Sequence, residues 1–247
     1  MIVKERGIIR KELQEELQAV RVVDSYNVRN SKRFINSCKE SGFANLNNGS
    51  TFQGEGSYVV LDFGKELCGG IRMVVEDSNG MAKWRLTFGE SLMESFSSIG
   101  EKNATNDHSP RDFEVVTGKT SDSYFGQTGF RFVKVELITD APVILQDIFA
   151  VSLLPEFDRE AEITTNDALL NDIIKTAAYT LKLNFQNGYI WDGIKRDRMI
   201  WCGDLHPEII TSLYLFGDND NIINSLSELR RQTEGKKWIN HIPSYSA

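Results

Sequence analysis

Apolar and polar residues alternate with a period of two through the middle of the chain, a pattern typical of half-buried β-strands. The strand-like segments are residues 58–63, 70–75, 83–88, 130–137 and 144–151. Glycines punctuate these segments, and no helical periodicity intervenes between them. Short strands with glycine-rich connections predict an antiparallel β-sandwich over residues 51–156.

The periodicity changes after residues 155–159, where apolar positions begin to recur every three or four residues. This period predicts helices. A first helix is expected from a cap at Thr165 or Asn166 to about Gly188. Two more are expected, one over about residues 205–217 and one from a cap among Asp218, Asn219 and Asp220 to about Gly235.

These patterns predict a multidomain protein that combines β and α structure. Residues 1–50 would form an N-terminal segment that could belong to the sandwich. Residues 51–156 would form the sandwich domain, and residues 157–247 the helical domain. A chain of 247 residues is long enough for two such domains.

Composition narrows the functional classes. Hydrophobic residues make up 40% of the chain and charged residues 26%, as in ordinary globular proteins. The net charge of −7 argues against a nucleic-acid partner, which would favour a basic surface. No segment approaches the roughly 20 apolar residues of a membrane span, and the N-terminus lacks a signal-peptide core. We therefore expect no membrane contact and, if Met1 is the natural start, a cytoplasmic location.

The cysteines predict neither a disulfide framework nor a metal site. Cys38, Cys68 and Cys202 are scattered, and no CxxC pair occurs. We expect all three to be buried free thiols. Because the sequence also shows no nucleotide-binding or metal-binding signature, we expect no cofactor and no metal.

Residues 191–204, with the sequence WDGIKRDRMIWCGD, concentrate three carboxylates, two guanidiniums and two indoles. A sugar site needs this combination, because carboxylates accept hydrogen bonds from hydroxyl groups and an indole covers the apolar face of a pyranose. A carboxylic acid can also protonate a leaving oxygen. The alternative is a cluster of salt bridges at a helix entrance, where acidic groups are favoured and pair with arginine.

The order of these residues resembles the active-site signature D-x-x-x-R-E-R-x-x-W-x-G-D of α-L-rhamnosidases of glycoside hydrolase family 78. The resemblance implies that Asp197 is the general acid. It also implies that Asp192, Arg196, Trp201 and Asp204 contact rhamnose, and that hydrolysis inverts the anomeric centre. Asp197 departs from the family, which has Glu at this position.

An aspartate is one methylene shorter than a glutamate, and a misplacement of about 1 Å can lower a rate roughly 10²-fold. Either the backbone compensates, or the leaving group differs, or the protein binds a sugar without cleaving it efficiently. Residues 61–64, 88–92 and 128–133 also resemble the sandwich that precedes the catalytic barrel in this family.

In that family the helices open an (α/α)6 barrel, which needs about a dozen helices, whereas three are predicted here. The fold class implied is therefore an antiparallel β-sandwich followed by the first helices of an (α/α)6 barrel. The family's general base lies later in the barrel, so it is not assigned to this chain. We expect a truncated enzyme, inactive by itself, whose exposed helical faces favour self-association.

The resemblance implies hydrolysis of terminal α-L-rhamnosides by the full-length protein, with a rhamnosylated small molecule or oligosaccharide as its partner. Three alternatives remain open. The first is a carbohydrate-binding protein without turnover, and the second is a six-hairpin glycosidase that acts on another sugar. In the third, the sandwich is a protein-interaction module and residues 191–204 form only a structural salt-bridge cluster.

Overall fold

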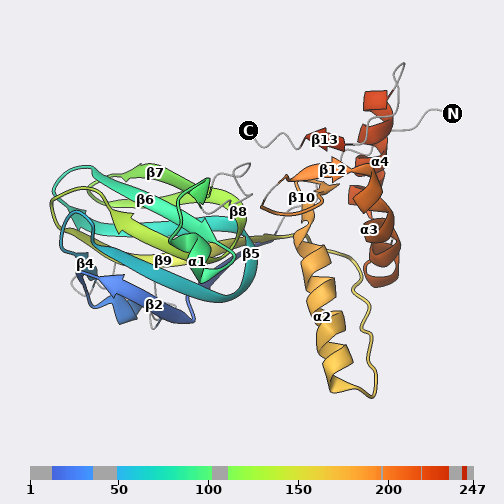
Figure 1. Ribbon diagram of the computed structural model, residues 1–247, viewed down its shortest axis with the longest axis horizontal. Coiled ribbons are helices and arrows are strands. Elements are labelled where there is room, and N and C mark those ends of the chain that lie inside the picture. Colours follow the sequence, from blue (N-terminus) through green and yellow to red (C-terminus); the bar gives the residue numbers. More distant parts are fainter. Residues whose placement is uncertain are drawn as a thin grey trace. The chain divides into compact units, whose positions relative to one another are not determined.

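The computed structural model describes residues 13–35, 49–101, 111–195, 197–217, 219–233 and 241–243. The chain divides into two compact units, which are described separately. One unit is Glu15–Ser152, and the segment Leu153–Ala247 contributes the described elements of the other. The first is built from strands and the second mainly from helices (Figure 1). The prediction of an antiparallel β domain followed by helices is therefore confirmed.

The described residues of the β unit form one nine-stranded sheet, and the pairings among β2 to β9 are antiparallel. Its strands are β1 (Leu13–Gln18), β2 (Arg21–Tyr26), β3 (Val28–Arg29), β4 (Ser50–Phe52), β5 (Tyr58–Ser78), β6 (Ala82–Gly89), β7 (Asp112–Thr117), β8 (Ser121–Leu137) and β9 (Val143–Leu154). The order is β3-β4-β9-β5-β8-β6-β7, with β1 beside β9 and β2 beside β5. Two short helical segments, η1 (Ser31–Ile35) and α1 (Leu92–Ser95), join strands.

Strand β5 merges two segments that the sequence predicts as separate strands. Its pairing with β8 continues through register shifts between Asp62 and Leu67 and between Gly69 and Ile71. Gly64 has a φ of 83°, which glycine adopts without steric cost, so the chain bulges there and does not turn back. Strands β1 to β4, strand β7 and the first half of β8 were not predicted from the sequence.

The core of the β unit is rich in aromatic side chains. Trp84 is fully buried, and its indole N–H donates a 2.9 Å hydrogen bond to the Thr117 hydroxyl. Phe88 and Phe130 meet edge to face with ring centroids 4.9 Å apart. A buried indole with a satisfied N–H and edge-to-face rings is the packing that aromatic residues favour. This core, which draws residues from nearly every strand, holds the unit together.

Asp62 on β5 is a buried carboxylate that accepts four hydrogen bonds. Arg131 donates two, at 2.8 and 3.1 Å, while Arg21 and the backbone N–H of Gly64 donate one each, at 3.0 and 2.8 Å. Burial by itself would raise the pKa of Asp62. The hydrogen bonds from Arg131 and Gly64, the charge of Arg131 and the hydrogen bond from Arg21 outweigh burial and lower this pKa overall.

We expect the Asp62→Asn variant to lose about 1–3 kcal/mol of unfolding free energy at pH 7, because hydrogen bonds to a charged acceptor are lost. The lowered pKa stabilises the fold above the unfolded-state pKa of about 4, and this contribution fades as pH falls through the folded-state value. Urea unfolding at pH 7 and pH 3 measures both effects. The exposed Asp140→Asn serves as the control. Equal pH dependence in Asp62→Asn and the wild type would contradict this role.

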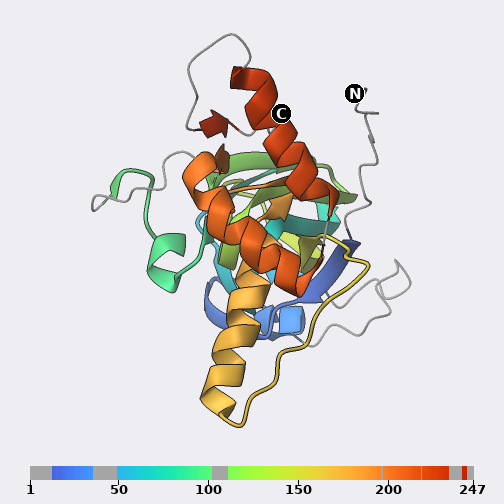
Figure 2. The same ribbon diagram turned by 90° about the vertical axis from the view of Figure 1, so that its right-hand side faces the viewer.

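The helical unit contains α2 (Ala168–Leu183), α3 (Cys202–Leu215) and α4 (Asp220–Thr233), which face the viewer in Figure 2. Two short antiparallel sheets of two strands each accompany the helices. In one, β10 (Phe185–Gln186) and β11 (Tyr189–Ile190) form a hairpin, and in the other β12 (Met199–Trp201) pairs with the distant β13 (His241–Pro243). The three predicted helices are thus present. In the core of the helical unit, Phe157, Phe185 and Phe216 pack together. The rings of Phe157 and Phe216 are stacked, with centroids 4.1 Å apart.

The predicted cap of the first helix is wrong, whereas that of the third is confirmed. Asp167, not Thr165 or Asn166, caps α2, because its carboxylate accepts hydrogen bonds from the N–H groups of Leu169 and Leu170. The Thr165 hydroxyl, two residues before this cap, instead accepts a hydrogen bond from the backbone N–H of Asp167. Asn219 caps α4 through a 3.3 Å hydrogen bond from the Ile222 N–H. The predicted positions Asp218 and Gly235 lie outside the described residues.

Several apolar side chains on the three helices are exposed. They are Leu169, Leu170 and Ile173 on α2, Ile210, Leu213 and Tyr214 on α3, and Ile223 and Leu226 on α4. None of the helices formed by the described residues is both long enough and apolar enough to cross a membrane. The predicted self-association through these faces stays a prediction.

Candidate functional site

The residue 191–204 segment, called the motif loop below, lies between β11 and the first turn of α3. The β10–β11 hairpin positions its start, because the left-handed residues Asn187 (φ 54°) and Gly188 (φ 81°) form a tight turn. The N–H of Trp191 then donates a 2.8 Å hydrogen bond to the carbonyl of Asn184, the C-cap residue of α2. The motif loop thus begins at a fixed point beside the end of α2.

Asp192 closes the motif loop on itself. Its backbone N–H donates to the Met199 carbonyl at 2.9 Å, and the Met199 N–H donates to Asp192 Oδ1 at 2.8 Å. The side chain is half-buried. A carboxylate that accepts a backbone hydrogen bond is held in one orientation, so this predicted sugar contact also shapes the loop that carries the other candidates.

Asp197, the predicted general acid, is half-buried on the loop that Asp192 and Met199 close. The next residue, Arg198, has the unusual φ of 51° and is 7% exposed. Its guanidinium lies 5.8 Å from the ring centroid of the buried Trp191, within the range of a cation–π interaction. The strained backbone at Arg198 directly follows the candidate acid, and such strain clusters at functional sites. Arg196, a predicted sugar contact, lies outside the described residues.

Trp201 and Asp204 stand at the entrance of α3. Trp201 is the N-cap residue of the helix and is half-buried, while its backbone belongs to β12. Asp204 lies in the first helical turn and is exposed. A negative charge near a helix N-terminus is favourable, so the exposed Asp204 carboxylate suits its position in the first turn of α3.

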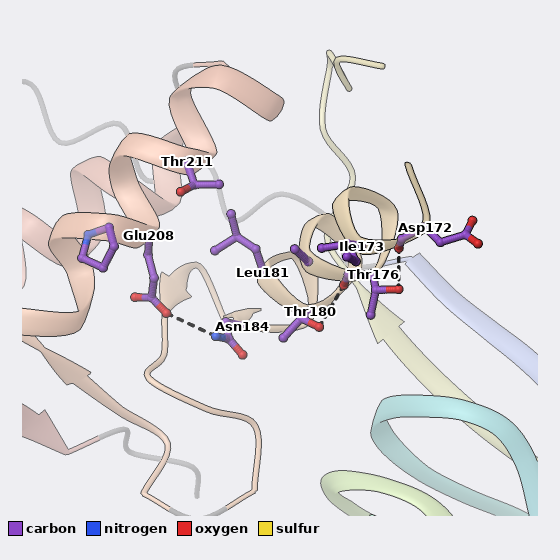
Figure 3. A pocket seen from close by; sticks show the side chains of 10 residues that line it. Asp172, Ile173, Thr176, Thr180, Leu181, Asn184, Glu208 and Thr211 are labelled. Atoms are coloured by element: carbon purple, nitrogen blue, oxygen red, sulfur yellow. Dashed lines mark hydrogen bonds between the residues drawn. The ribbon is translucent and has the colours of Figure 1, made fainter. Parts of the chain in front are cut away.

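Sequence reasoning missed Glu208, which lies one helical turn beyond Asp204 on α3. Glu208 lines a groove of about 690 Å³ between α2 and α3 (Figure 3). Its carboxylate accepts a 3.2 Å hydrogen bond from the Asn184 side-chain amide, which Figure 3 shows pointing toward it. The sequence did contain one signal for Glu208. It lies four residues after Asp204, and residues four apart share one face of a helix.

Burial is the largest cause that raises the pKa of Glu208, to about 7. The hydrogen bond from Asn184 opposes this rise, and the negative charges of Asp204 and Asp192 add to it. The fold therefore brings two predicted sugar contacts within electrostatic reach of one unusual carboxyl. Carboxyl groups with a strongly raised pKa cluster at functional sites.

The expected burial of the thiols is confirmed for Cys68 and wrong for Cys202. Cys68 is buried, Cys202 is exposed at the start of α3, and Cys38 lies outside the described residues. Cys202 is exposed because the first turn of α3 places its side chain toward solvent instead of the helical core. Within the described parts of the chain, no group of three or more His, Cys, Asp and Glu side chains could hold a metal ion.

Two protein-family models match the chain, one on each unit. The model of the bacterial α-L-rhamnosidase concanavalin-like domain matches residues 53–154. The model of the bacterial α-L-rhamnosidase six-hairpin glycosidase domain matches residues 158–247. The matches follow each other along the chain, and the second includes the whole motif loop.

Solved structures with a similar fold include three rhamnosidases. A Klebsiella oxytoca rhamnosidase with rhamnose bound matches with a TM-score of 0.72 and 18% identity, over 95% of this chain and 45% of its own. The family-78 rhamnosidase of Bacillus sp. GL1 matches with a TM-score of 0.64 and 20% identity, over 76% of this chain and 19% of its own. The α-L-rhamnosidase of Dictyoglomus thermophilum matches with a TM-score of 0.60 and 20% identity, over 79% of this chain and 22% of its own.

This chain therefore spans less than half the length of each of these three structures. At such low identity the likeness is one of fold. No curated protein matches the chain.

Proposed function

Because the chain belongs to the bacterial α-L-rhamnosidases of glycoside hydrolase family 78, we propose that the complete product of its gene hydrolyses terminal α-L-rhamnosides. The motif loop is the observation that carries this proposal. It has the residue order of the family signature except at Asp197, which replaces Glu, and it leads into the helix α3. Loops at the ends of rigid elements are where catalytic groups concentrate.

Asp197 is proposed as the general acid that protonates the glycosidic oxygen as the bond to the sugar breaks. Protonation of the leaving oxygen supports the departure of a poor leaving group. Hydrolysis with inversion needs a second carboxylate about 6.5–9.5 Å from the acid, with the attacking water between them. Inversion is part of this proposal, and the general base is assigned to no residue of this chain.

The remaining candidates would hold the sugar. Asp192 and Asp204 would accept hydrogen bonds from sugar hydroxyls, and Arg196 would donate to hydroxyl or ring oxygens. Trp201, half-buried at the N-terminus of α3, would cover an apolar face of the pyranose. A rhamnose ring is suited to such a site because it presents hydroxyl groups together with apolar C–H and methyl surfaces.

One observation favours a second candidate function. Asp197 replaces the Glu of the family signature, and a shorter acid reaches less far toward the glycosidic oxygen. A protein that keeps the sugar contacts but has a retracted acid would bind carbohydrate with little turnover. The same exchange is consistent with a six-hairpin glycosidase that acts on another sugar.

We expect the complete gene product to hydrolyse an aryl α-L-rhamnoside. The 247-residue chain alone should be inactive, because inverting hydrolysis needs a general base and none of its residues is proposed for that role. Release of the aryl group measures turnover, and calorimetric titration with L-rhamnose measures binding. Aryl α-L-arabinoside and β-D-galactoside serve as control substrates.

Each result separates the alternatives. Rhamnose binding without hydrolysis of any substrate would favour the binding protein. Hydrolysis of a control substrate but not of the rhamnoside would favour a glycosidase of another specificity. Neither binding nor turnover would contradict both proposals and favour a structural role for the motif loop. The cytoplasmic location stays a prediction.

A further inference from the structure

Asn184 connects the two ends of the motif loop. Its backbone carbonyl accepts the hydrogen bond from the Trp191 N–H, at the start of the loop. Its side-chain amide donates to Glu208, one turn beyond the end of the loop. As the C-cap of α2, Asn184 has a position set by that helix. Glu208 therefore joins α3 to the residue that anchors the loop.

Among the described residues, two acidic side chains raise the pKa of Glu208 through their charge. Asp204 lies one turn earlier on α3, and Asp192 comes from the motif loop; both act on the Glu208 carboxyl. Asp172 on α2 is the other ionisable side chain that lines the groove. A negative charge on Glu208 would be repelled by these groups and poorly solvated, whereas a neutral carboxyl still accepts the hydrogen bond from Asn184.

We propose that Glu208 is a positioning residue of the sugar site, and that its ionisation loosens the motif loop that carries Asp192 and Asp197. The link to sugar binding rests on the proposed function, whereas the link to loop order does not. Glu208 touches no reacting atom in this scheme. It acts through Asn184 and through the charges of Asp192 and Asp204.

The direction of the pH effect follows from the raised pKa. Opening of the loop, in this proposal, includes release of Asn184 from Glu208 and entry of water into the groove between α2 and α3, so that the Glu208 carboxyl returns to an ordinary pKa of about 4.3. In the closed arrangement its pKa is about 7. Opening therefore releases a proton between these two values. The closed loop is most stable below pH 4.3, loses stability as pH rises toward 7, and changes little above that.

Amide hydrogen exchange of the 247-residue chain tests this directly at Trp191 and Met199, whose N–H groups hold the loop. After correction for the intrinsic exchange rate, we expect wild-type protection to fall about tenfold or more between pH 5 and pH 8. Glu208→Gln, which keeps a neutral acceptor for Asn184, should stay protected at both values. Glu208→Ala should be poorly protected at both.

The matched control is Glu162→Gln, at an exposed glutamate of the same unit, which should behave as the wild type. Unchanged wild-type protection from pH 5 to pH 8, or a parallel fall in Glu208→Gln, would overturn the proposal. The wild-type measurement decides this even if the alanine variant does not fold.

Calorimetric titration of the complete gene product with L-rhamnose at pH 5.5 and pH 8 tests the link to the sugar. We expect wild-type affinity to weaken about tenfold at pH 8, and Glu208→Gln affinity to stay constant. An equal loss of rhamnose affinity at pH 8 in the wild type and in Glu208→Gln would contradict the link between Glu208 and sugar binding. If no variant binds rhamnose at either pH, the proposed function fails, and the amide-exchange result alone decides whether Glu208 positions the loop.

Discussion

The Asp197→Asn variant of the complete gene product should lose about 10²–10⁴-fold of its kcat on an alkyl α-L-rhamnoside, the range that general acid catalysis contributes. An amide cannot supply the proton that an alkoxide leaving group needs. The same variant should lose much less on a p-nitrophenyl rhamnoside, because nitrophenolate leaves without protonation. Initial rates on the two substrates measure this contrast.

The contrast separates an acid from a sugar contact. A variant of a proposed sugar contact, Asp204→Asn, should lose activity on both substrates to a similar extent. If Asp197→Asn shows the same parallel loss, Asp197 binds the sugar and the general acid lies elsewhere. If Asp197→Asn leaves the rates on both substrates unchanged, Asp197 does not have the role of the corresponding residue in the family signature.

Asp197→Glu restores the family residue and tests the effect of side-chain length. If the backbone of this chain has not compensated for the shorter acid, the variant should be roughly tenfold or more faster than the wild type on the alkyl rhamnoside. A slower variant would indicate that the loop is built around aspartate. The left-handed Arg198 directly after it is one feature by which the backbone differs locally from an ordinary loop.

Gly70→Ala should destabilise the β unit by about 3 kcal/mol or more. A β-carbon at Gly70 would overlap the carbonyl oxygens of Phe125 and Gly126 and lie 2.9 Å from the Gly126 carbonyl carbon. These are backbone atoms of the paired strand β8, so no side-chain rotation relieves the overlap. The midpoint of urea unfolding measures the effect.

Gly118→Ala is the matched control in the same unit. A β-carbon there would meet only ordinary contacts, at 3.7 Å from the Ser121 β-carbon and 3.8 Å from the Thr120 oxygen. This variant should unfold within about 1 kcal/mol of the wild type. If the two variants were equally stable, strand β5 would approach β8 less closely than the structure shows.

The helical unit was predicted well because its signals are local. Apolar residues at spacings of three and four define one face of each helix, and this periodicity appears in the sequence without any partner. The caps were harder. Thr165, Asn166 and Asp167 are all capping residue types, and the choice of Asp167 depends on where the backbone leaves the helical conformation.

The strands were predicted in part. Residues 58–63 and 70–75 each show a strand pattern, but only the paired strand β8 reveals that they form one bulged strand. Strand β7 escaped prediction because several of its side chains are only half-buried, which weakens the alternation. Pairing between distant segments stabilises a strand, and a local window of sequence does not contain that information.

The candidate site shows the same division. The sequence alone determined the helical periods, the existence of a β domain before them and the ordered motif of residues 191–204, because each depends on residue types at short spacing. Only the tertiary structure decided that Asn184 and Glu208 join the ends of that loop. Glu208 acquires its raised pKa from burial and from Asp204 and Asp192 together, and such an environment arises only when α2, α3 and the loop are packed.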